Sequence, residues 1–397
     1  MPSQRAPHRV VLYSHDSVGL GHTRRNLAIA HALSHRLPGL VGRSVTGLLL
    51  SSLAVPTHHL PPGFDLVAVP SIGKSGGAYH PRHLGVDMAD LVRLRSQILR
   101  AAVVGFAPDL MVIDRHVHGL GGELVPTLRA LRSRHPRTRV VLGLRDVLDD
   151  PAAAAAEWDR LDLAAVRRHV DEIWVYGDPR VHDVTATGEV PAELGNLVRF
   201  TGFLAAGRRA LERTEHERPY VLTMVGGGSD GVRLCRTAAA APVPPAHTHV
   251  VVTGPQMSPL DHADVVAAAG PDTVVLRSVP DGLESIRGAA AIVTMAGYNT
   301  VAEALPTATP VLLVPRETPR VEQLVRARGL ARAGAADLLR GDDLDPGRLG
   351  RWLARAVTRR VDRADLDLDG LTAVSRSAAA LLTDRTHTLP EDSDVAV

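Results

Sequence analysis

The chain has 397 residues, 45% of them hydrophobic and 22% charged, with a formal net charge of +2. This length exceeds a comfortable single core and favours two domains of ordinary size. Cys235 is the only cysteine, which excludes an internal disulfide and a multi-cysteine metal site. The basic stretch 129–139 lacks interleaved aromatic residues, so no nucleic-acid partner is expected. Because no run of ~20 apolar residues is present, we expect a cytoplasmic protein without an integral membrane segment.

Short β-branched runs alternate with helical patterns along most of the chain. This alternation predicts an α/β fold in which two Rossmann-like, doubly wound domains face each other across a cleft. The expected strands are residues 9–14, 44–50, 66–69, 110–113, 140–143 and 172–176, and then 220–225, 249–253, 273–276, 291–294 and 311–314. A polar segment ending in Pro219 separates the halves. The predicted boundaries are an N-terminal domain over 1–205, a linker over 206–219, a C-terminal domain over 220–383 and a frayed tail over 384–397.

The first expected strand runs into a glycine-containing turn and then into a helix. Gly19 and Gly21 permit close approach of the backbone to a ligand, and His22 begins the helix. Ligands of doubly wound sheets bind at such carboxyl ends, where an imidazole can serve as a general base. The alternative interpretation is that His22 only caps the helix or packs the turn. A dinucleotide site is disfavoured, because Arg24 stands where that fingerprint needs glycine.

A second strand-to-helix turn is rich in glycine. Its residues are Gly227, Gly228, Ser229, Asp230 and Gly231. Backbone N–H groups at such a helix start attract anions, so the turn is predicted to hold a diphosphate. It is not a Walker loop, because the Gly-Lys-Ser/Thr ending is missing. The alternative is a plain tight turn.

A third glycine loop precedes a helix that carries Glu303. The loop residues are Gly297, Tyr298, Asn299 and Thr300. Glu303 is expected in the first helical turn, where its carboxylate can accept two hydrogen bonds from vicinal ribose hydroxyls. Alternatively, the acid only complements the helix dipole. At the next expected helix start, Glu322 and Gln323 are suited to binding sugar hydroxyls.

Together these motifs resemble the MurG-like and family-28-like glycosyltransferases of the GT-B type, almost along the whole chain. The segments that carry the resemblance are 19–26, 119–124, 142–146, 226–231, 297–303 and 322–323. The resemblance implies that the C-terminal domain binds a nucleoside-diphosphate sugar of the UDP or dTDP type. Main-chain groups near Ser278 and Val279 are then expected to meet the base, Glu303 the ribose, and Glu322 with Gln323 the transferred sugar. The N-terminal domain is expected to bind a small-molecule or carbohydrate acceptor through a hydroxyl group.

The resemblance also implies an inverting transfer without a bound metal or cofactor, since helix dipoles and amides stabilise the departing diphosphate. His22 is the candidate general base. Asp114, which follows the strand 110–113, is the candidate group that orients the imidazole. His15, Asp16 and Asp146 lie at strand ends of the same domain and are the reserve candidates.

The segment between Val69 and Met88 is expected to be a long loop that covers the acceptor pocket and includes Lys74 and Tyr79. A mobile loop without a ligand is the alternative. Residues 23–25, Thr-Arg-Arg, depart from the apolar helix start of MurG-type chains, so a lipid acceptor is not carried over. Two other functions remain open, a sugar-nucleotide 2-epimerase on the same fold and a non-catalytic sugar-nucleotide-binding protein.

Overall fold

The computed structural model describes residues 6–15, 21–52, 59–75, 78–210 and 218–384. Its N-terminal half is built on a seven-stranded sheet with the order β3-β2-β1-β6-β7-β8-β9. The strands are β1 (His8–Tyr13), β2 (Val45–Ser51), β3 (Phe64–Ala68), β6 (Leu110–Asp114), β7 (Arg139–Arg145), β8 (Glu172–Tyr176) and β9 (Val198–Phe200). The helices are α1 (Gly21–Val41), α2 (Met88–Phe106), η2 (Leu120–Gly122), α3 (Val125–Arg134), α4 (Pro151–Trp158), α5 (Leu163–His169) and η3 (Ala192–Leu197).

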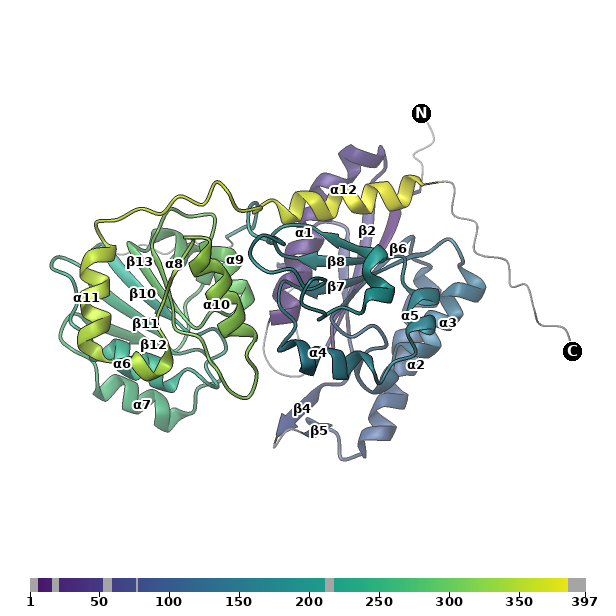
Figure 1. Cartoon of the computed structure of the whole chain (residues 1–397). Coiled ribbons are helices and arrows are strands. Elements are labelled where there is room, and N and C mark those ends of the chain that lie inside the picture. Colours follow the sequence, from purple (N-terminus) through teal and green to yellow (C-terminus); the bar gives the residue numbers. More distant parts are fainter. Residues whose placement is uncertain (1–5, 16–20, 53–58, 76–77, 211–217, 385–397) are drawn as a thin grey trace, which may run out of the picture.

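The C-terminal half repeats this plan in a six-stranded sheet with the order β12-β11-β10-β13-β14-β15. The strands are β10 (Tyr220–Met224), β11 (Thr248–Val252), β12 (Thr273–Leu276), β13 (Ala291–Thr294), β14 (Val311–Leu313) and β15 (Asp337–Leu338). The helices are α6 (Val232–Ala239), α7 (Pro259–Ala267), α8 (Gly282–Gly288), α9 (Tyr298–Ala304), α10 (Glu322–Arg332), η4 (Gly341–Asp343) and α11 (Pro346–Ala356). The two sheets lie side by side, each with helices packed around it (Figure 1).

Within the described residues, every pairing in these two sheets is parallel. Such strands are covered on both faces, which explains the continuous apolar burial of Val10–Tyr13 and Leu110–Ile113. The strand order reverses between β1 and β6 and again between β10 and β13. Ligands of doubly wound sheets bind beyond the strand ends at these two positions. All the strands expected from the sequence are present, and the additional β9 and β15 are only three and two residues long.

The segment expected to be a long loop between Val69 and Met88 contains a β-hairpin. Strands β4 (Ile72–Ser75) and β5 (Ala78–Pro81) pair in an antiparallel ladder. Ile72 is fully buried in a small cluster with Leu91 and Leu120, and Tyr79 packs against it. This apolar anchor orders the hairpin, so the expectation of a structureless loop is corrected.

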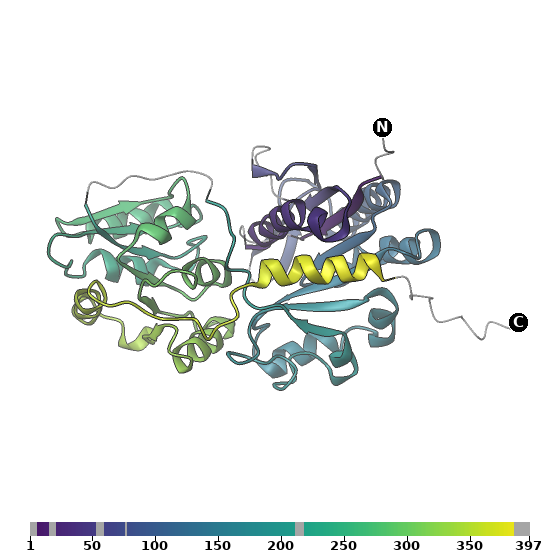
Figure 2. The same ribbon diagram turned by 90° about the horizontal axis from the view of Figure 1, so that it is seen from above.

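The last helix, α12 (Gly370–Thr383), belongs spatially to the N-terminal domain. It packs against α1 and lies over the N-terminal sheet in both views (Figures 1 and 2). Its buried residues are Leu371, Val374, Ser375 and Ala378, and Arg139 Nε donates to the Leu381 carbonyl (3.2 Å). The C-terminal domain therefore does not extend to residue 383 as predicted, because this apolar stripe is buried on α1. In the described part of the chain, no helix is long and apolar enough to cross a membrane.

Candidate functional site

His22 and Asp114 meet at the strand-order reversal of the N-terminal sheet. Asp114 ends β6, and His22 lies in the first turn of α1, which follows β1. The His22 Nδ1 atom is 3.0 Å from Asp114 Oδ2. The carboxylate is buried, whereas 23% of the His22 side chain is exposed. The structure thus brings together the two residues that the sequence proposed as a base and its orienting group.

Arg25 shares this carboxylate. Its Nη2 donates to both Asp114 oxygens, at 3.0 and 2.8 Å, and also lies 3.0 Å from His22 Nδ1. A guanidinium can only donate, so a hydrogen bond from Arg25 to Nδ1 and one from Nδ1–H to Asp114 require different His22 tautomers. Burial opposes the ionisation of Asp114, but Arg25 and His22 nevertheless hold the pKa of its carboxyl well below the ordinary value. A carboxylate facing Nδ1 favours the tautomer with the proton on Nδ1, which leaves Nε2 as the proton acceptor.

Two further histidines, His15 and His116, lie near His22. The ring centroid of His15 is 4.6 Å from that of His22 and 4.7 Å from that of His116. Burial and the charge of His22 lower the pKa of His15 to about 2, and burial with the charge of Arg115 lowers that of His116 to about 3. Both are therefore neutral at physiological pH. Of these three rings, His22 is the one in contact with a carboxylate. The predicted residues Asp16 and Gly19 lie outside the described residues.

The glycine turn 226–231 lies at the strand-order reversal of the C-terminal sheet, between β10 and α6. Gly226 and Gly228 have φ values of 69° and 94°, a region that glycine adopts without strain. A Cβ on Gly228 would lie 2.1 Å from the Thr253 carbonyl oxygen, so the turn is packed closely on the neighbouring loop. Ser229 and Asp230 are exposed, and Gly231 is the residue before the helix. The structure thus has a closely packed glycine turn where the sequence predicted one, between a strand and a helix.

Glu303 lies deeper than the sequence suggested. Because α9 begins at Tyr298, Glu303 is in its second turn, so both the expected first-turn position and the helix-dipole interpretation are wrong. Arg24 from α1 and Arg208 from the interdomain segment both donate to Glu303 Oε1, at 2.6 and 2.9 Å. Glu303 Oε2 is buried and has no hydrogen-bond partner among the described residues. The Oε1 atom thus forms hydrogen bonds that link the two domains, and Oε2 is left to accept a hydrogen bond from a ligand.

Tyr298 and Asn299 connect the same loop to the other domain. Two guanidinium groups lie close to the Tyr298 ring, with Arg25 Cζ at 5.6 Å and Arg326 Cζ at 5.7 Å from its centroid. Its hydroxyl accepts a hydrogen bond from the Leu204 N–H (3.1 Å). Asn299 donates to the Gly21 carbonyl (2.8 Å). Gly297, the residue before α9, and the buried Thr300 complete the predicted loop.

The expected sugar-binding pair begins α10. Glu322 Oε1 accepts from Arg316 Nη2 (2.6 Å), and Gln323 Oε1 accepts from the Arg316 N–H (3.0 Å). Glu322 Oε2 is buried without a partner. Ser278 and Val279, which were expected near the base, follow β12. Ser278 is exposed and Val279 is half-buried. Glu322 therefore resembles Glu303 in offering one unpaired carboxylate oxygen.

The two domains are also joined by a buried ion pair. Arg326 of α10 donates to both oxygens of Asp146, at 2.7 and 2.6 Å, and both side chains are almost fully buried. Asp146, a reserve candidate for the base, is thus held in an interdomain contact. Among the described residues, no group of three or more His, Cys, Asp or Glu is arranged to hold a metal ion.

Sequence reasoning gave no role to the arginines at this interface. Arg145 stands in a motif that carried the family resemblance, yet nothing in its local pattern distinguished it from other arginines. Arg208 lies in the segment 206–219, which was predicted to be the interdomain linker. Their positions beside the predicted site depend on how the two domains dock.

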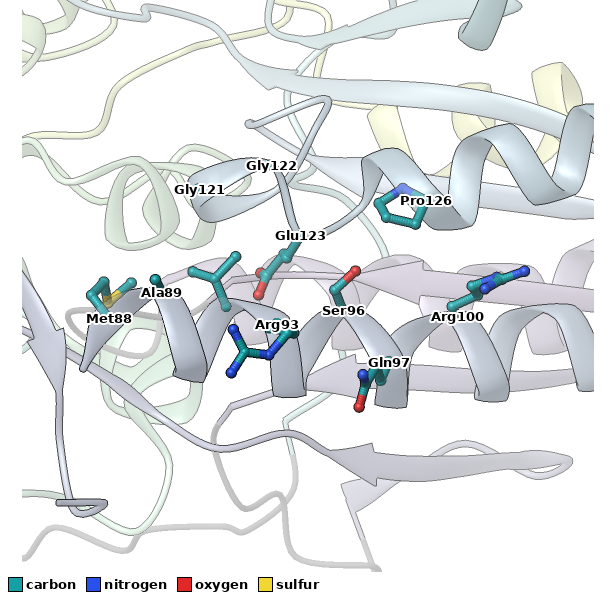
Figure 3. A pocket seen from close by; sticks show the side chains of 11 residues that line it. Met88, Ala89, Arg93, Ser96, Gln97, Arg100, Gly121, Gly122, Glu123 and Pro126 are labelled. Atoms are coloured by element: carbon teal, nitrogen blue, oxygen red, sulfur yellow. The ribbon is translucent and has the colours of Figure 1, made fainter. Parts of the chain in front are cut away.

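A groove of about 680 Å³ runs along the N-terminal half of α2. Figure 3 shows Gly121 and Gly122 on its opposite wall, with Glu123 pointing from that turn toward α2. Glu123 forms a buried ion pair with Arg95 and also accepts from the Tyr13 hydroxyl. Met88 lines the groove and also packs against the cluster of Ile72, Leu91 and Leu120. Ile72 belongs to β4 of the hairpin, as does Lys74, and Tyr79 of β5 packs on the same cluster. The cluster thus connects the hairpin to Met88 at the groove.

Comparison with known proteins gives matches of three kinds. Residues 222–365 match the glycosyltransferase family 28 C-terminal domain. A protein of Methanosarcina mazei described as an uncharacterized glycosyltransferase is 23% identical over 312 residues, which are 75% of this chain and 77% of the relative. The glycosyltransferase SnogD from Streptomyces nogalater has a similar structure, with a TM-score of 0.55 at 14% identity over 96% of both chains. MurG of Acinetobacter baumannii gives 0.51 at 16% identity, over 95% of this chain and 99% of MurG.

The chain has the GT-B fold, with a family-28-like C-terminal domain. This confirms the predicted fold class and the resemblance drawn from the motifs. Within this GT-B protein, the family 28 segment includes the glycine turn 226–231, the loop 297–303 and the pair at 322–323. The His22 and Asp114 cluster lies outside it, at the facing reversal point.

Proposed function

We propose that this protein transfers a sugar, with inversion and without a metal or other cofactor, from a nucleoside-diphosphate sugar of the UDP or dTDP type. The acceptor is the hydroxyl group of a small molecule or carbohydrate. His22 Nε2 takes the hydroxyl proton, the acceptor oxygen attacks the anomeric carbon, and the carbon–oxygen bond to the diphosphate breaks with its electron pair on the diphosphate. N–H groups of the turn 227–231 stabilise that leaving group.

One observation carries this proposal. The family 28 segment provides the reversal point of the C-terminal sheet, and the N-terminal reversal point presents an imidazole backed by a buried carboxylate 3.0 Å away. The contacts of Glu303 with Arg24 and of Asn299 with Gly21 tie the two reversal points together. A proton acceptor therefore lies next to the predicted ribose-binding loop, as a direct displacement requires.

The test compares wild-type protein with His22→Ala. Calorimetry with UDP, dTDP and GDP identifies the nucleotide, and the matching sugar nucleotides are then assayed with a panel of hydroxyl acceptors. We expect His22→Ala to keep its nucleotide affinity and to lose about 10²- to 10⁴-fold in turnover. His35→Ala, which removes an exposed histidine of α1, is the matched control. Transfer by His22→Ala at the wild-type rate would show that another group is the base.

Incubation of the donor without acceptor separates this proposal from the alternatives. A transferase gives at most slow hydrolysis, which NMR detects as free sugar. Appearance of a 2-epimer of the sugar nucleotide instead identifies an epimerase, and nucleotide binding without turnover of any acceptor identifies a binding protein.

A further inference from the structure

The inference concerns Arg145, the last residue of β7, and it rests on the proposed function. Among the described residues, the Arg145 side chain forms no hydrogen bond or ion pair, and its Nε atom is buried without a partner. The other arginines at this end of the sheet are paired. Their carboxylate partners are Asp114 for Arg25, Glu157 for Arg115 and Asp146 for Arg326. Arg145 is thus an uncompensated cation at the domain interface.

The charges that act on Arg145 are mostly of the same sign. The largest effects come from Arg25, Arg326, Glu322 and Arg115, and only Glu322 in this group is a carboxylate. Glu322 is bonded to Arg316 instead. Burial and the neighbouring guanidinium groups lower the pKa of Arg145 to about 9. Arg145 is half-buried, and an anion that reaches it would stabilise it, since a partly desolvated charge without a partner is costly.

A second polar group without a partner among the described residues lies on the neighbouring strand β8. Arg145 of β7 is paired in register with Tyr176 of β8. Gly143 of β7 is paired in register with Asp114 of β6. Partners on neighbouring strands point to the same face of a sheet. The Tyr176 hydroxyl is buried without a hydrogen-bond partner and lies above Gly143, where a Cβ would be 2.1 Å from it. Arg145 and Tyr176 therefore offer N–H and O–H donors on the face that carries Asp114, the partner of His22.

We propose that Arg145 and the Tyr176 hydroxyl bind an oxyanion group of the acceptor, a phosphate or a carboxylate, and so hold its reacting hydroxyl near His22. Both donors belong to the N-terminal domain, opposite the glycine turn assigned to the donor diphosphate. Planar guanidinium groups bind both kinds of oxyanion through two parallel hydrogen bonds. The acceptor class is thus narrowed from hydroxyl compounds in general to hydroxylated phosphate esters or carboxylic acids.

The test titrates inorganic phosphate and acetate into the protein saturated with UDP, so that the donor turn is already occupied. Calorimetry at constant ionic strength is expected to show binding of at least one anion to wild-type protein. Arg145→Gln should weaken that binding about 10- to 100-fold, as for a lost hydrogen bond to a charged group. Tyr176→Phe, which keeps the ring, should weaken it less. Arg129→Gln, which removes an exposed arginine of α3, should leave it unchanged. The preferred anion shows whether the acceptor is a phosphate ester or a carboxylic acid.

Three results would overturn the inference. The first is that no anion binds to the UDP complex. The second is that wild-type protein, Arg145→Gln and Tyr176→Phe bind the anion equally well. The third is that the main defect of Arg145→Gln is weaker binding of UDP. The last would place Arg145 in the donor site. Failure of the wild-type protein to bind any nucleoside diphosphate would instead contradict the proposed function, and it is measured before any anion is added.

Discussion

Arg24 of the N-terminal domain donates a 2.6 Å hydrogen bond to Glu303 of the C-terminal domain. Arg208 occupies the same carboxylate oxygen, so the second oxygen of Glu303 remains without a partner in a buried position. The residue proposed to bind ribose is therefore also part of the contact that holds the domains together.

Glu303→Gln is expected to weaken UDP binding about tenfold, the effect of losing roughly 1.4 kcal/mol of hydrogen bonding to a charged group. The diagnostic measurement is the ratio of affinities for UDP and 2′,3′-dideoxy-UDP. Wild-type protein should prefer UDP, and the variant should bind both about equally. Arg24→Met is the control for the interdomain contact and should keep the preference for UDP. A preference that survives in Glu303→Gln would remove Glu303 from the ribose site.

Asp114→Asn is expected to lower sugar transfer about 10²- to 10⁴-fold with little change in nucleotide affinity. The amide cannot stabilise an imidazolium as the carboxylate does, and it no longer favours a proton on His22 Nδ1. Nitrogen-15 NMR of the His22 ring is the direct measurement. The proton should lie on Nδ1 in wild-type protein and move to Nε2 in the variant. A ring protonated on Nε2 in wild-type protein would show that Arg25, not Asp114, sets the tautomer.

Gly228→Ala is expected to unfold the predicted phosphate turn. The new Cβ would lie 2.1 Å from the Thr253 carbonyl oxygen at a φ of 94°, so the backbone must move. Gly226→Ala is the matched control, since its φ of 69° is also positive but no atom lies within 4 Å of the new Cβ. We expect the control to cost about 1 kcal/mol of stability and Gly228→Ala to cost more and weaken UDP binding over tenfold. Calorimetry and thermal unfolding measure both effects, and equal behaviour of the two variants would contradict the argument.

His249 makes stability depend on pH. It is fully buried, and burial lowers its pKa to about 4. Because the folded protein keeps it neutral while the unfolded chain binds a proton below about pH 6.5, its stabilising contribution is complete above that pH. The contribution is lost as the pH falls toward 4.

His249→Gln is therefore expected to flatten the pH dependence. Between pH 7.5 and 5.5, wild-type protein should lose about 1.4 kcal/mol more of its free energy of unfolding than the variant. Urea unfolding at both pH values is the measurement. His83→Gln, at an exposed position, should retain the wild-type slope, and a wild-type slope in His249→Gln would refute the assignment.

Much of the fold follows from local patterns. The strands 172–176, 273–276 and 291–294 have the boundaries that the sequence predicted, because an apolar run between turn residues is sufficient to mark a buried strand. The glycine turn and His22 were found for the same reason, since each lies in a segment that leads from a strand into a helix. Short elements such as β15 and the hairpin 72–81 were missed because their order comes from packing against other segments.

The sequence by itself determined the strands of the two doubly wound sheets and the glycine turn, because each depends on neighbours a few residues apart. Only the tertiary structure decided which charged side chains form ion pairs. Arg24 and Glu303 are 279 positions apart, α12 returns to pack on α1, and Arg145 is left without a counterion because the nearby carboxylates are taken by other arginines. Such pairings depend on the docking of whole domains, and no local periodicity encodes them.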